Sequence, residues 1–202
     1  MHLNERGFAV GAILLAVVLM SVVAAAMVLG NRGPSGGAGD HASKVNGATI
    51  IQQGTNLRMG FDVMTARGIS PGSITFDAVA NTGLFNPSAG GAQVQTAPAT
   101  AQTAVTPWAY HSGKIVGVGT TAGIDYMVVL GKLRDTVCAQ INLALYNSAT
   151  IPASGATYAA WSTGAALDLS AGISGIDNRP EGCVSTTGGT DDNVYYTVTA
   201  AQ

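Results

Sequence analysis

Charged residues are scarce in this sequence. Asp, Glu, Lys and Arg make up 10% of its 202 residues, whereas they make up about 25% of an average soluble domain. The formal net charge is only -2. The few basic residues do not gather into the clusters that hold phosphate groups, so we expect no binding of nucleic acid. Residues 8–30 contain no charged side chain at all.

Sequence motifs for metal and nucleotide chemistry are also missing. The chain has no His-Glu-x-x-His, no P-loop and no Cys-x-x-Cys motif, and these are common signatures of metalloproteases, nucleotide-binding proteins and zinc sites. Asp191 and Asp192 could offer oxygen ligands to Ca²⁺, but a turn rich in Asp and Asn is the commoner meaning of such a segment. We therefore predict no enzymatic activity, no catalytic residue, no cofactor and no metal site, with calcium beside Asp191 as the alternative.

The sequence has only two cysteines, Cys138 and Cys183. An even number of cysteines in an exported chain indicates a disulfide, and their spacing does not match a zinc site. In the chain-entropy model, closing a loop of this size stabilises the folded state by roughly 4 kcal/mol. We predict one disulfide between Cys138 and Cys183.

The uncharged run over residues 8–30 is long enough to span a membrane. As a helix, residues 8–29 would extend about 33 Å, which matches the hydrocarbon core of a bilayer. A cleaved secretory signal normally has an apolar region of roughly 7–15 residues, so this run is too long, although Ala24-Ala25-Ala26 could pass for a cleavage site. A simple signal anchor is a second interpretation of the same run.

A third interpretation comes from the residues at the start of the run. Glu5-Arg6-Gly7 is followed directly by Phe8 and the apolar segment, and this boundary resembles the prepilin leader of type IV pilins and pseudopilins. The resemblance implies that a prepilin peptidase cuts between Gly7 and Phe8 and that the new Phe8 amine is methylated. Ala12 stands where most members of the family have Glu, so major, minor and tip subunits all remain possible.

The resemblance also implies a structural role in a filament. The subunit would be anchored in the bacterial inner membrane and then join an extracellular or periplasm-spanning filament, with other copies, the assembly machinery of a pilus or secretion system and the inner membrane as partners. Small residues in the apolar segment would allow close packing. The residues expected to pack in the filament core are Phe8, Gly11, Ala12, Leu15, Val18, Leu19 and Val22.

The composition divides the chain into four parts. Residues 1–7 form the leader, 8–30 the hydrophobic transmembrane and filament-core helix, 31–40 a hinge rich in Gly and Pro, and 41–202 an extracellular head. The head begins with an amphipathic helix over residues 41–67, with Asp40 as its N-cap and Gly68 as its stop. Its buried face is predicted from spacings of three and four residues. The residues on that face are Gly47, Ile50, Gly54, Leu57, Phe61 and Met64.

The rest of the head is predicted to contain a small antiparallel sheet. A short strand is possible at 73–79, and residues 108–118 and 125–130 read as a hairpin. Residues 133–147 read as a helix, and 194–198 as a closing strand. The predicted fold is α+β and pilin-like, with a long hydrophobic N-terminal α-helix followed by an amphipathic helix packed on the sheet. The rival hypothesis is a single-pass, membrane-anchored adhesion or binding domain that does not polymerise.

Overall fold

The computed structural model describes residues 38–119, 124–163, 167–169, 175–187 and 191–201. The chain divides into two compact units, Met1–His41 and Ala42–Gln202, and the second contains all of the described strands. The predicted leader, the apolar segment and most of the hinge therefore lie outside the described residues. Among the described helices, none is both long and apolar enough to cross a membrane.

The first described element is the helix α2, Ala38–Ala66. It starts three residues earlier than expected, so Asp40 lies inside the helix and is not its N-cap. The predicted buried face is confirmed, since all six of its residues are buried. The predicted stop is also confirmed: Gly68 has a φ of +85°, and Ile69 N–H donates to the Met64 carbonyl at 3.1 Å while Gly68 N–H donates to Thr65. These two bonds form a Schellman cap.

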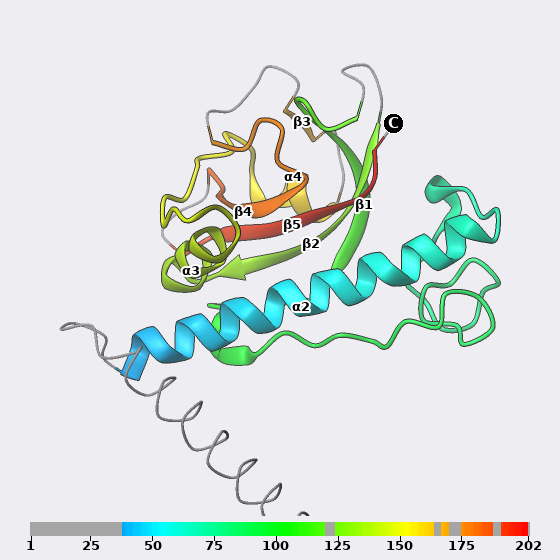
Figure 1. Cartoon of the computed structure of the whole chain (residues 1–202), viewed down its shortest axis with the longest axis horizontal. Helices are drawn as coiled ribbons and strands as arrows, with labels where there is room; N and C mark the ends of the chain where they lie inside the picture. The colour runs from blue at the N-terminus through cyan, green and yellow to red at the C-terminus, as the bar shows by residue number, and fades with distance from the viewer. Residues whose placement is uncertain (1–37, 120–123, 164–166, 170–174, 188–190, 202) are drawn as a thin grey trace, which may run out of the picture. The chain divides into compact units, whose positions relative to one another are not determined.

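The core is organised around a curled five-stranded sheet, shown in Figure 1. Its strands are β1 (Ala109–Ile115), β2 (Asp125–Leu133), β3 (Asp168–Leu169), β4 (Glu181–Ser185) and β5 (Asn193–Ala200). The strand order is β3-β1-β2-β5-β4. All neighbouring pairs are antiparallel except β1 and β3, which are parallel.

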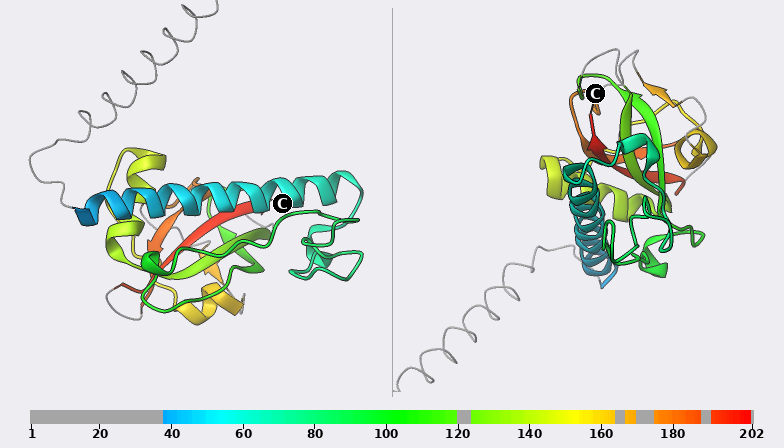
Figure 2. Two further views of the ribbon diagram at one scale, coloured as in Figure 1. Left: turned by 90° about the horizontal axis from the view of Figure 1, so that it is seen from below. Right: turned by 90° about the vertical axis from the view of Figure 1, so that its right-hand side faces the viewer.

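Both faces of the central strands are buried. Successive side chains of a strand point to opposite faces of the sheet, so neighbouring residues of β2 enter two different cores. On β2, Val128 and Leu130 belong to the core beneath α2 and the helix α3 (Asp135–Tyr146). Met127 and Val129 belong to a second core, which contains Trp161 of the helix α4 (Tyr158–Thr163). Figure 2 shows α2 lying along one side of the sheet. The head therefore has three layers, with helices on both faces of the sheet.

The predicted fold class is wrong as stated. The chain does mix helices and strands, but the described part contains no long apolar N-terminal helix, and its first helix, which starts at Ala38, is not apolar enough to cross a membrane. The sheet is neither small nor purely antiparallel. The sequence predicted no strand at β4 and allowed only a brief, unplaced strand within residues 151–176, where β3 lies. The two strands have only two and five residues, too few for a clear alternating pattern.

The strand expected at 73–79 is also wrong. The chain there forms a short 3-10 helix η1, Pro71–Ser73, followed by a single bridge between Thr75 and Gly83. The Asp77 carboxylate accepts hydrogen bonds from the N–H groups of Val79 and Ala80 at 2.9 and 2.7 Å. A side chain that binds its own backbone in this way competes with strand pairing.

The predicted hairpin, helix and closing strand are confirmed by β1 with β2, by α3 and by β5. The disulfide is confirmed as well: Cys138 of α3 and Cys183 of β4 are bonded at 2.02 Å, and the two residues are 45 positions apart. Both cysteines are buried, so the bond joins α3 to the edge of the sheet from inside the core.

Candidate functional site

The predicted functional residues fall into two groups. Those for processing and filament-core packing, from Gly7 to Val22, lie outside the described residues, so the structure does not place them. The cysteine pair is described and has a structural role. The features of the head that could contact another molecule are its strand edges, its polar clusters and its exposed apolar surface.

The outer edge of β4 is closed by side chains and a neighbouring loop. The Asn142 amide donates to the Cys183 carbonyl at 2.7 Å and accepts from the Cys183 N–H at 2.9 Å, which replaces the pairing that another strand would give. Tyr146 Oη donates to the Glu181 carbonyl, and Ser185 N–H donates to Pro152. An edge whose polar groups are already paired does not accept a strand from another chain.

Asp191 and Asp192, just before β5, link that strand to the start of α3. Asp135 N–H donates to Asp191 Oδ1 at 2.6 Å, and Asp135 Oδ1 accepts from the Asn193 amide at 2.7 Å. Asp192 forms an ion pair with Lys132 at 3.0 Å. Within the described ranges, no three His, Cys, Asp or Glu residues are placed to hold a metal ion. The structure thus gives these aspartates contacts within the protein and gives no support to the calcium alternative.

His111 is the half-buried histidine of β1. Its Nδ1 lies 3.2 Å from the Ser112 carbonyl, and its Nε2 contacts the Trp161 carbonyl of α4. Burial lowers the pKa of His111, and the two carbonyl contacts act in the opposite direction. The contacts of the ring therefore link β1 to α4.

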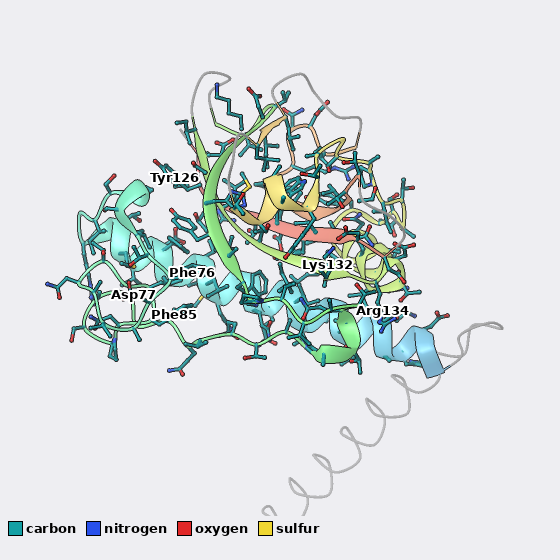
Figure 3. All side chains as sticks on the ribbon, turned by 180° about the vertical axis from the view of Figure 1, so that it is seen from behind. Phe76, Asp77, Phe85, Tyr126, Lys132 and Arg134 are labelled. Atoms are coloured by element: carbon teal, nitrogen blue, oxygen red, sulfur yellow. A yellow bond between two sulfur atoms is a disulfide. The ribbon has the colours of Figure 1, made fainter. Side chains whose placement is uncertain are left out.

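Five aromatic residues form a cluster near the C-terminal end of α2. Phe61 lies 4.4 Å from Tyr110, and Phe76 lies 5.2 Å from Phe85 and 5.8 Å from Tyr110, between ring centroids. Tyr126 stacks on Tyr110 at 6.1 Å, and Figure 3 shows Phe76, Phe85 and Tyr126 on the same side of the head. The cluster fastens the loop after α2 to the sheet. No local sequence pattern indicates this cluster, because its members come from four separate segments.

The outer face of α2 has an uncharged stripe with exposed apolar side chains. Val45 is 64% exposed, Met59 57% and Val63 42%. Steps of three and four residues put them on one side of the helix, whereas Lys44, Arg58 and Asp62 lie along a neighbouring line. The residues of this stripe, which we call the outer stripe, are Val45, Ala48, Gln52, Asn56, Met59 and Val63.

A hollow of about 380 Å³ lies beside the C-terminal half of the outer stripe. One wall is α2 and the other is the chain over residues 90–95. The two walls approach closely because residue 60 is glycine: a Cβ there would lie 2.9 Å from both Ala92 Cβ and Leu84 Cδ1. None of the lining residues is charged. They are Asn56, Met59, Gly60, Val63, Gly90, Gly91, Ala92, Gln93 and Gln95.

The second wall of the hollow is held in place by hydrogen bonds. Ala92 N–H donates to the Leu84 carbonyl at 3.1 Å, and Gln53 of α2 donates to the Thr96 carbonyl at 2.9 Å. Arg67 donates to the Ser88 carbonyl at 2.9 Å. The hollow is therefore a formed feature of the head surface, and with the outer stripe it is the candidate site for contact with another molecule.

Comparison with protein-family models, with curated proteins and with solved structures finds no match to this chain.

Proposed function

We propose that this chain is a structural subunit of a type IV pilus-like or pseudopilus filament. The observation that carries the proposal is the junction at Gly7 and Phe8, where a short polar leader meets an uncharged segment that runs to residue 30. A prepilin peptidase would cut this junction, and Phe8 would become the methylated N-terminus. The apolar segment would hold the subunit in the inner membrane before it enters an extracellular or periplasm-spanning filament.

The head has properties that suit this role. Its disulfide is of the kind that persists outside the reducing cytoplasm. The low fraction of charged residues suits a surface that packs against copies of itself. The closed edge of β4 disfavours joining of subunits by strand addition there, and the outer stripe of α2 offers an apolar surface instead.

The second candidate is an anchored adhesion or binding domain that works as a monomer. The observation in its favour is Ala12, which occupies the position where most pilins have a glutamate. In this case the apolar segment would remain in the membrane, and the hollow beside α2 would take a ligand or partner without polymerisation.

Surface material from the native host separates the two functions. Filaments sheared from cells should contain the protein and sediment at high speed, and both signals should disappear in a strain without prepilin peptidase. A matched strain that carries Gly7→Ala should behave like the peptidase-deficient strain, whereas Asn4→Ala, a change elsewhere in the leader, should not. Protein that stays in the membrane fraction as monomers in all strains would contradict the filament role and favour the anchored domain.

A further inference from the structure

We propose that Asn142 is a positioning residue for the disulfide, and that it aligns α3 with β4 so that the sulfurs of Cys138 and Cys183 meet as the bond forms. The inference goes beyond the proposed filament role and does not depend on it, because it concerns only two elements of the head. These two elements, α3 and β4, pack side by side (Figure 1).

Cys138 and Asn142 lie one helical turn apart and reach the same residue of β4. Residues four apart on a helix share one face. The Cys138 sulfur is bonded to the Cys183 sulfur, and the Cα atoms of the two cysteines are 5.4 Å apart. The Asn142 amide donates to the Cys183 carbonyl at 2.7 Å and accepts from the Cys183 N–H at 2.9 Å. One face of α3 therefore binds both the side chain and the backbone of a single residue.

The contacts along the edge of β4 allow one alignment with α3. The Glu181 carbonyl accepts from Tyr146 Oη. On the other side of the cysteine, Ser185 N–H donates to the Pro152 carbonyl. Because outward-facing backbone groups of a strand recur every two residues, the next alignment would be displaced by about 6.7 Å. Such a shift would carry the two cysteines beyond the separation that a disulfide spans.

The Asn142 amide is also fully paired only in this alignment. Its second N–H donates to the Thr150 carbonyl at 2.9 Å, so both of its N–H groups and its oxygen have partners. Asn142 is 1% exposed. A packed arrangement that leaves a buried amide without partners is unfavourable, so the amide favours the aligned arrangement over other compact ones.

Burial of both sulfurs divides bond formation into two steps. One protein thiolate attacks a disulfide oxidant such as oxidised glutathione, which gives a mixed disulfide and releases one glutathione thiolate. The other protein thiolate then attacks the mixed disulfide, which closes the Cys138–Cys183 bond and releases the second glutathione. Each protein thiol loses one proton, and each released glutathione takes one up. Because the two cysteines are 0% and 1% exposed, the closed core has no room for the adduct, and Asn142 acts on the second step.

The test follows oxidation of the reduced full chain in detergent by oxidised glutathione, with acid quenching and mass spectrometry to count adducts and disulfides. Asn142→Ala should form the adduct at an unchanged rate and close it about 10-fold more slowly, as the loss of one or two hydrogen bonds predicts. Asn142→Asp should also close slowly, because a carboxylate cannot donate to the Cys183 carbonyl. The matched control Gln140→Ala keeps the Cβ that lies near Gly47 of α2 and should close at the normal rate.

Phe61→Leu separates alignment from general stability. It weakens the aromatic cluster and leaves the contacts between α3 and β4 intact. At urea concentrations that give the two variants equal stability, Phe61→Leu should close its adduct about 10-fold faster than Asn142→Ala. Equal closure rates would overturn the inference, as would normal closure in Asn142→Ala or an effect confined to adduct formation.

A second measurement covers a reduced Asn142→Ala chain that does not fold. The oxidised variant, isolated from its host, would be treated with dithiothreitol, which reaches the sulfurs only when α3 separates from β4. Its disulfide should be reduced faster than that of Phe61→Leu at equal stability. Equal reduction rates would show that Asn142 does not control this contact and would overturn the inference.

Discussion

Replacing Gly54 with alanine tests how closely α2 lies on the sheet. A Cβ on residue 54 would lie 2.8 Å from Cε1 and 2.9 Å from Cζ of Tyr195. Tyr195 is fully buried on β5, and its hydroxyl donates to Glu181 Oε1 at 2.5 Å. The ring cannot move aside without breaking this hydrogen bond, so the clash must be absorbed by α2 or by the loss of the bond.

The expected cost can be set against the gain in helix propensity. Alanine is favoured over glycine in a helix by about 1 kcal/mol. Overpacking costs about 1–3 kcal/mol, and losing a hydrogen bond to a charged group costs about 1.5–3 kcal/mol. If both costs apply, the net effect of Gly54→Ala should be a loss of about 1.5–5 kcal/mol in the free energy of unfolding.

Denaturation of the full chain in detergent, followed by tryptophan fluorescence, measures this loss. Trp108 reports on the site, because its ring packs edge-on against Tyr195 at 5.7 Å. The matched control is Gly47→Ala on the same helix face, where a Cβ would make ordinary contacts of 3.4 Å or more and stability should be unchanged or raised. Equal stability of the two variants would refute the close approach of α2 to Tyr195.

The remaining predictions concern the disulfide, the strand edge, pH and assembly. Replacing both cysteines with serine should lower the free energy of unfolding by about 4 kcal/mol in the chain-entropy model, and an unchanged denaturation midpoint would contradict that. Asn142→Ala leaves the N–H and the carbonyl of Cys183 unpaired, so it should lower the free energy of unfolding by about 2–6 kcal/mol. The exposed strand edge should also promote aggregation, which light scattering would detect. Because burial lowers the pKa of His111 from its ordinary value of 6.5, the unfolded state binds the proton first and stability should fall as the pH falls below 6.5. His111→Gln should lose this component of the pH dependence. Val45→Asp should reduce sedimentable filaments at least ~10-fold, while Val79→Asp should not.

The sequence was most informative where a regular pattern meets a buried surface. The face of α2 from Gly47 to Met64 could be predicted because spacings of three and four residues have one geometric meaning in a helix. Gly68 could be predicted as a stop because glycine adopts a positive φ at no steric cost. The β1–β2 hairpin and β5 were visible from their runs of β-branched and aromatic residues.

The sequence was least informative where long-range contacts decide the structure. Nothing local indicates that Asp168–Leu169 should pair in parallel with β1, because a two-residue strand has no periodicity. Phe76 and its neighbours are β-formers, so the sequence predicted a strand there. Instead, the Asp77 carboxylate binds nearby backbone N–H groups and Phe76 packs in the aromatic cluster, and the chain forms a loop. The hollow beside α2 depends on Gly60 and Ala92 meeting across the fold, and no pattern in the sequence links those two positions.

The filament role is tested most directly by the mass of the mature N-terminus. Protein isolated from the native host, with and without prepilin peptidase, would be digested and its N-terminal peptide identified by mass spectrometry. A chain that begins with N-methylated Phe8, and that retains residues 1–7 when the peptidase is absent, is the predicted result. A mature chain that still begins at Met1 would contradict the filament role, as would one that begins after residue 26.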